Sequence, residues 1–146
     1  GKEKPDYYGY MKNLLQFNQQ MMQESGFDAP NIHYHKGLFN TTVFPVGPVA
    51  YVHLDGDWYE SVHTMLVRIT PWLSVGGWIV LDDVHTYSGA RKAFEEYFAV
   101  DFDSIRITSP QQTMLVERYH TVFELQFHKR TLVRKVSVKC GDKTKK

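Results

Sequence analysis

Apolar side chains recur along this chain with two spacings, and the alternation between the two predicts the order of its elements. Apolar residues three or four apart indicate one face of a helix over residues 7–25, with Asn18 off the pattern and Gly26 after the last turn. The same spacing predicts helices over residues 59–70 and 88–98. The apolar residues on these faces are Met11, Leu14, Leu15, Met21, Met22, Val62, Met65, Leu66, Ile69, Ala90, Phe94, Tyr97 and Phe98.

Short apolar runs between these helices predict strands. The runs at residues 49–54 and 78–81 are nearly continuous, which is typical of parallel strands covered on both faces. Further strands or extended segments are expected at residues 32–35, 104–108, 113–117, 123–127 and 131–138. Strands that alternate with helices predict an α/β layer fold with right-handed crossovers.

Composition narrows the class of protein. A chain of 146 residues fits one domain, and 42% hydrophobic with 23% charged residues argues against disorder and collagen-like repeats. A single cysteine, Cys140, excludes an internal disulfide bond. No apolar run reaches the roughly 18 residues of a membrane span, and the charged first six residues do not resemble a signal peptide. We therefore expect a cytoplasmic protein without a membrane partner.

Positive charge gathers at the C-terminal end. Residues 129–146 hold eight Lys or Arg residues against Asp142 alone, a local charge of +7, so the remaining 128 residues carry −6 of the net +1. An arm for nucleic acid or membrane is one interpretation of such a segment. A solvated edge strand followed by a frayed terminus explains it more simply, because lysines on an edge discourage aggregation. We therefore divide the chain into residues 1–128 and a basic strand and tail at 129–146.

Two pairs of acidic residues follow the two apolar strands. Asp55 and Asp57 come after residues 49–54, and Asp82 and Asp83 come directly after residues 78–81. Ligands of open α/β sheets bind beyond the carboxyl ends of the strands. Carboxylates gathered there repel one another, so either some carry protons or a cation holds them together. Oxygen ligands favour Mg²⁺, with Mn²⁺ or Ca²⁺ as alternatives; the other interpretation is that each pair caps the next helix.

An Asp-x-Asp after an apolar strand resembles the haloacid-dehalogenase-like phosphatases. The rest of that pattern is missing here. The family expects Thr or Val where Tyr59 stands, and it expects a Lys between the acidic clusters. The 24 residues between Asp57 and Asp82 contain no Lys. A phosphatase of this kind remains an alternative.

Four segments carry a closer resemblance. They are VAYVHLDGDWYES at 49–61, LSVGGWIVLDD at 73–83, Gly26-Phe27 with HKGLF at 35–39, and GARKAFEEYF at 89–98. Together they resemble the macrocin O-methyltransferase family of metal-dependent enzymes that use S-adenosylmethionine, over roughly residues 10 to 100. The resemblance implies a class I methyltransferase-type (Rossmann-like) fold, with a mostly parallel sheet flanked by helices.

The resemblance also implies a reaction and a set of site residues. Asp55, Asp82 and Asp83 match the ligands of a Mg²⁺ ion that takes two neighbouring oxygens of the substrate, and Asp57 matches the general base. Methyl transfer to a sugar or natural-product hydroxyl needs this arrangement, because an alcohol is a poor nucleophile until its proton is removed. His85, two residues after the second acidic pair, offers an alternative catalytic base.

One expected part of a class I methyltransferase is missing. Such a fold opens with a strand, a glycine-rich turn and a second strand that ends in an acidic residue. This chain contains no Gly-x-Gly, so the cofactor-binding residues are unknown and residues 1–128 look like the metal and acceptor end of a catalytic domain that lacks its first strands. Three explanations stay open: a partial chain, a partner that supplies the cofactor site, or a non-catalytic metal-binding remnant. As partners we expect a small hydroxylated, sugar-like acceptor and no nucleic acid, with a homo-oligomer left open.

Overall fold

The computed structural model describes two compact units, residues 1–37 and residues 38–146. The residues that it describes are 13–26, 30–45, 47–104, 112–118, 121–127 and 131–138. The described residues contain no helix with the length and hydrophobicity of a membrane span.

The first unit contains helix α1 (Leu14–Glu24). The helix predicted over residues 7–25 is confirmed where the structure describes it, but none of its residues is buried. The strand predicted at residues 32–35 is wrong, because these residues belong to no strand of the structure. A strand is defined by hydrogen bonds to a neighbouring strand, and residues 32–35 are not among the paired strands that the structure describes.

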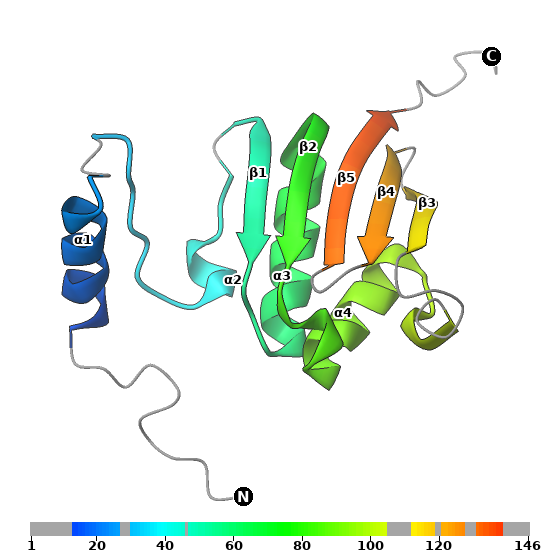
Figure 1. The fold of residues 1–146 in the computed structure, drawn as a ribbon, viewed down its shortest axis with the longest axis horizontal. Coiled ribbons are helices and arrows are strands. Elements are labelled where there is room, and N and C mark those ends of the chain that lie inside the picture. The colour runs from blue at the N-terminus through cyan, green and yellow to red at the C-terminus, as the bar shows by residue number, and fades with distance from the viewer. Residues whose placement is uncertain are drawn as a thin grey trace, which may run out of the picture. The chain divides into compact units, whose positions relative to one another are not determined.

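The second unit is a five-stranded sheet with helices (Figure 1). Its elements in chain order are α2 (Phe39–Thr42), β1 (Val49–Leu54), α3 (Tyr59–Ile69), η1 (Thr70–Trp72), β2 (Leu73–Leu81), η2 (Asp83–His85), α4 (Ser88–Phe98), β3 (Gln112–Arg118), β4 (Thr121–Phe127) and β5 (Thr131–Val138). The predicted strand at 113–117 corresponds to β3, the extended segment at 123–127 to β4 and the one at 131–138 to β5. The strand predicted at 104–108 does not include Ser104, which lies in a helical turn, and residues 105–108 lie outside the described residues.

The strands lie in the order β1-β2-β5-β4-β3. β1 and β2 are parallel, whereas the β2–β5, β5–β4 and β4–β3 pairs are antiparallel. The α/β class is confirmed, with one correction: the sheet is mixed rather than mostly parallel. The reason is that β4 and β5 are joined by a short connection, which forces antiparallel pairing, whereas α3 is the crossover that allows β1 and β2 to be parallel.

β2 begins five residues before the predicted strand because a glycine pair forms a bulge instead of ending the element. The register shifts between Val49, opposite Leu73, and Tyr51, opposite Trp78. Gly76 has a φ of +86°, and a Cβ at Gly77 would lie 2.9 Å from the Ser74 carbonyl oxygen. Both positions therefore require glycine, and together they absorb the extra residues of β2.

The basic segment at the C-terminal end contributes a central strand. β5 lies between β2 and β4, so the expectation of a solvated edge strand is wrong. Its core-facing residues explain the position: Val133 is fully buried opposite Ile79 of β2 and Leu125 of β4. The division at residues 128 and 129 stays a prediction, since residues 128–130 lie outside the described part of the chain.

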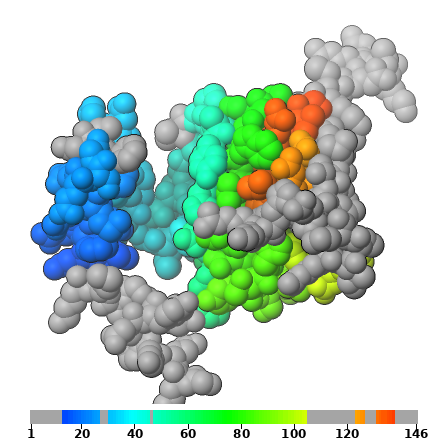
Figure 2. All heavy atoms as spheres, viewed as in Figure 1, coloured from blue at the N-terminus to red at the C-terminus, as the bar shows by residue number. Residues whose placement is uncertain are grey.

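Helices α3 and α4 both lie behind the sheet in Figure 1 and cover one face of it. The apolar positions predicted for α3 and α4 are all buried, and they form one core with alternate residues of the strands. The opposite face carries Tyr51, which is 63% exposed. Figure 2 shows atoms of β1, β2 and β5 at the surface on this side. The core therefore lies on the helix side of the sheet.

Candidate acidic site at the strand ends

The parallel pairing of β1 and β2 brings the two acidic pairs together. Leu54 is opposite Leu81 in the register, and the Asp82 amide donates a 3.1 Å hydrogen bond to the Leu54 carbonyl. Asp55 and Asp82 therefore follow paired residues at the same edge of the sheet. This is the convergence that the sequence predicted.

The electrostatics of Asp83 indicate that its carboxyl group interacts with the other three. Its pKa is raised from 3.8 to about 6, first by partial burial and then by the negative charges of Asp57, Asp55 and Asp82. A side-chain hydrogen bond with Asp55 raises it further, because that bond favours the protonated form. All four predicted carboxylates thus belong to one electrostatic cluster.

Helix capping does not account for these aspartates. Helix α3 begins after Trp58, and no side chain forms an N-terminal cap there. Asp82 is the N-cap residue of η2, and its side chain forms no capping hydrogen bond either. The capping alternative is therefore wrong for both pairs.

The donor set has the chemistry of a site for a hard divalent cation, since all four side chains offer carboxylate oxygens. Their arrangement is not yet that of a ligand shell. Among the residues that the structure describes, no group of three or more His, Cys, Asp or Glu side chains is placed to hold a metal ion. The carboxylate oxygens are donors that suit Mg²⁺. Without a cation, the carboxylates repel one another and are expected to lie apart. Binding of Mg²⁺ would therefore require the side chains to move closer together.

Two histidines lie beside the cluster in different environments. The Nε2 atom of His53, on β1, lies 3.6 Å from an Asp82 oxygen. The His85 ring packs edge-on against Phe102 at 4.9 Å, and its Nε2 lies 3.3 Å from the Thr131 hydroxyl oxygen. His53 therefore has an ion-pair contact with the acidic cluster, and the sequence did not single out this residue.

The loop that carries Asp57 is held against the start of α4. A Cβ at Gly89 would lie 2.9 Å from the Tyr59 amide nitrogen and 3.1 Å from the Asp57 carbonyl oxygen. The Tyr59 hydroxyl donates a 2.6 Å hydrogen bond to Glu96, which ties α3 to α4 and raises the pKa of Tyr59. Glycine at position 89 allows this close approach, and only its place inside a helical pattern could have drawn attention to it.

A groove of about 720 Å³ lies in the first unit, between α1 and residues 34–37. His35 and Lys36 are part of its lining, and none of the four aspartates is. The acidic site is accordingly built from the second unit alone.

The chain is similar to known O-methyltransferases in sequence. Residues 6–116 match the family described as macrocin-O-methyltransferase (TylF). Demethyldecarbamoylnovobiocin O-methyltransferase from Streptomyces niveus is 33% identical over 70 residues, which cover 47% of this chain and 27% of that protein. The 8-demethyl-8-(2,3-dimethoxy-alpha-L-rhamnosyl)-tetracenomycin-C 4'-O-methyltransferase from Streptomyces olivaceus is 35% identical over 94 residues, covering 63% of this chain and 36% of that protein.

The fold has a solved counterpart. The structure of the O-methyltransferase NovP superimposes with a TM-score of 0.59 at 20% identity, over 82% of this chain and 43% of NovP. The matched regions thus span about a quarter to two-fifths of these relatives. Because the family match covers residues 6–116, most of the chain and all four aspartates, the chain belongs to the macrocin O-methyltransferase family.

Proposed function

We propose that the protein transfers a methyl group from S-adenosylmethionine to a hydroxyl oxygen of a sugar-bearing natural product, with the help of Mg²⁺. The convergence of four aspartates at the ends of β1 and β2, in a chain of this family, carries the proposal. The name of one relative includes a rhamnosyl group and a 4'-oxygen, which supports a sugar hydroxyl as the acceptor. The family match also favours methyl transfer over phosphate-ester hydrolysis.

Asp55, Asp82 and Asp83 are the residues that we expect to hold the cation. When bound, Mg²⁺ would supply positive charge that stabilises negative charge on the acceptor oxygen. Asp83 has a pKa of about 6 without a cation, so it is mostly ionised at neutral pH and ready to bind one. Below that pH its proton competes with the cation, and we expect affinity for Mg²⁺ to fall.

Asp57 is the base that we propose. Its charge contributes to the raised pKa of Asp83, which supports a position of its carboxylate near the same site. A carboxylate within reach of the acceptor hydroxyl can take its proton as the oxygen attacks the methyl group. His85 is the weaker candidate, because its ring already contacts Phe102 and Thr131.

The test uses the full-length protein, S-adenosylmethionine and the rhamnosyl tetracenomycin substrate named for the relative. We expect methyl transfer that EDTA abolishes and Mg²⁺ restores. Asp57→Asn should lower turnover by about 100-fold or more, the usual effect of losing a general base, with Mg²⁺ affinity little changed. Glu24→Gln, which removes one negative charge from the first unit, is the control and should retain turnover.

Two results would count against these assignments. Full turnover in Asp57→Asn, with metal binding intact, would remove Asp57 as the base. Binding of Mg²⁺ without any binding of S-adenosylmethionine by the full-length protein would indicate a metal-binding remnant instead of an enzyme.

A further inference from the structure

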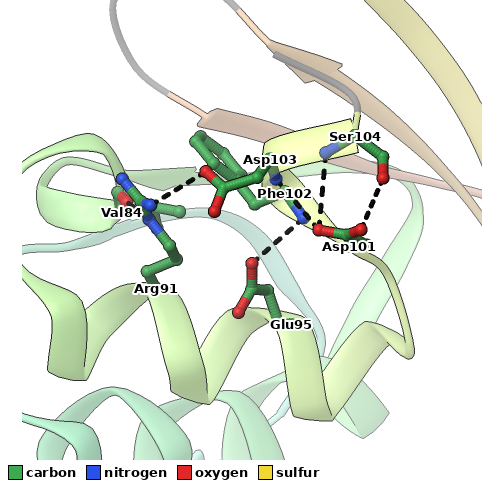
Figure 3. Close-up of polar contacts among 7 residues, drawn as sticks. All are labelled: Val84, Arg91, Glu95, Asp101, Phe102, Asp103 and Ser104. Atoms are coloured by element: carbon green, nitrogen blue, oxygen red, sulfur yellow. Dashed lines mark hydrogen bonds and ion pairs between the residues drawn. The ribbon is translucent and has the colours of Figure 1, made fainter. Parts of the chain in front are cut away.

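Arg91, on α4, makes three contacts with two separate parts of the second unit, the turn at Val84 and the segment at Phe102 and Asp103 (Figure 3). Its Nε donates a long, 3.4 Å hydrogen bond to the Val84 carbonyl. One terminal nitrogen lies 3.1 Å from a carboxylate oxygen of Asp103. The centre of the guanidinium lies 5.1 Å from the centroid of the Phe102 ring, a cation–π distance.

The segment at residues 101–104, which contacts the guanidinium, is held by its own hydrogen bonds. Asp101 accepts hydrogen bonds from the Asp103 amide and from both the amide and the hydroxyl of Ser104. The Phe102 amide donates a 3.0 Å hydrogen bond to Glu95 of α4, and the Phe102 ring is buried. Figure 3 shows these contacts side by side along α4. Arg91 therefore joins a fixed segment to its other partner, the Val84 carbonyl.

That carbonyl belongs to the turn that carries the second acidic pair. Val84 follows Asp82 and Asp83 directly, and its side chain is buried. The amides of Thr86 and Tyr87 donate 3.0 and 2.9 Å hydrogen bonds to the Asp83 carbonyl. The direction of both carboxylates thus depends on the conformation of this short turn.

We propose that Arg91 is a positioning residue that fixes the turn bearing Asp82 and Asp83. Its guanidinium is planar and always charged, so it can donate to the Val84 carbonyl while stacking on Phe102. Lysine has neither the planar group nor the fork of donors. The effect on Mg²⁺ binding rests on the proposed function, whereas the effect on the turn does not.

The exposed ion pair between Arg91 and Asp103 is not the contact that we expect to fix the turn. The Asp103 side chain is 67% exposed, and exposed ion pairs contribute little. The partly buried contacts of Arg91 with Val84 and Phe102 differ, because water does not replace them freely. Asp103→Asn removes only the ion pair, whereas Arg91→Met removes all three contacts. Comparing the two variants therefore shows whether the ion pair or the contacts with Val84 and Phe102 fix the turn.

The experiment compares Arg91→Met, Arg91→Lys and Asp103→Asn with the unchanged full-length protein. Hydrogen exchange of the Thr86 and Tyr87 amides reports on the turn, and the Val62 amide of α3 reports on overall stability. Mg²⁺ affinity is measured in parallel by calorimetry. Lys92→Met, which removes a neighbouring positive charge from the surface of α4, is the matched control.

We expect exchange at Thr86 and Tyr87 to rise about tenfold in Arg91→Met, with Val62 unchanged, and to rise less in Arg91→Lys. Mg²⁺ affinity should fall by about 10-fold, at the low end for residues that orient metal ligands. Asp103→Asn and Lys92→Met should resemble the unchanged protein.

Unchanged exchange at the turn in Arg91→Met, or an equal rise at Val62, would overturn the inference. Because Arg91→Lys keeps the charge, it provides the same local comparison if Arg91→Met fails to fold. If the unchanged protein binds no Mg²⁺, the proposed metal site fails, and the exchange data still decide the role of Arg91.

Discussion

Asp83 shows how the conformation of the backbone sets the chemistry of a single side chain. Its carboxyl group is partly buried beside three others, and its pKa rises to about 6. Asp101, in contrast, accepts hydrogen bonds from Ser104 and Asp103, and these lower its pKa. The pKa values of two aspartates in one chain are therefore shifted in opposite directions, and the sequence alone gives no sign of the difference.

Replacing Asp83 should stabilise the metal-free protein at neutral pH. The folded state holds the Asp83 proton more tightly than the unfolded state, so this group favours folding below about pH 4 and loses that effect as pH rises through about 6. We expect Asp83→Asn to increase the free energy of unfolding at pH 7.5 in EDTA and to flatten its pH dependence between 4 and 7. Urea unfolding over a pH series measures both.

Asp101→Asn is the matched variant, and we expect it to change the free energy of unfolding in the opposite direction. The lowered pKa of Asp101 means that its charge stabilises the folded state above pH 4, and that stability is lost on acidification. This variant should be less stable at pH 7.5. A loss of stability in metal-free Asp83→Asn at the same pH would show that the carboxylates do not repel one another as described.

At the scale of elements, the site depends on how closely α4 approaches the loop after β1. Replacing Gly89 with Ala places a methyl group against the backbone of Asp57 and Tyr59. Overpacking of this kind costs about 1–3 kcal/mol, more than the roughly 1 kcal/mol that Ala gains over Gly within a helix. We expect Gly89→Ala to lower the free energy of unfolding and to weaken Mg²⁺ binding.

Ser88→Ala is the control for this substitution, since the neighbouring Ser88 is exposed at the start of α4. Urea unfolding and Mg²⁺ calorimetry on both variants give the comparison. Equal stability and affinity in Gly89→Ala would mean that the loop moves aside without cost.

Local patterns predicted the elements that depend on local contacts. β1 and α4 have the predicted bounds, and the stripe from Val62 to Ile69 on α3 is buried as its spacing indicates. The central place of β5 could not be predicted, because it depends on pairing between Val133 and Ile79, far apart in the sequence. The role of Arg91 was hidden for the same reason, since Val84 and Asp103 come together only in the fold.

In the whole described sheet, β1 and β3 are the two edge strands, and the face opposite the helices carries exposed side chains. β1 pairs only with β2 among the described strands, and Tyr51 on it is 63% exposed. An unpaired edge with apolar side chains is a template for association with other chains.

A charged residue on this edge should reduce self-association of the 146-residue chain. We expect Tyr51→Lys to lower light scattering at high protein concentration, because lysine on an edge strand opposes pairing. Val75→Lys, on an exposed position of β2 that does not form the open edge, is the comparison. Equal scattering by the unchanged chain and Tyr51→Lys would show that β1 is not the site of association.

Calorimetric titration of Mg²⁺ into the full-length protein is the decisive test of the proposed metal site at Asp55, Asp82 and Asp83. We expect one bound cation at pH 7.5, weaker binding at pH 5.5 where Asp83 is mostly protonated, and no binding after Asp82→Asn combined with Asp83→Asn. Absence of binding by the folded, unchanged protein, or undiminished binding by the double variant, would contradict the assignment of the acidic cluster as a metal site.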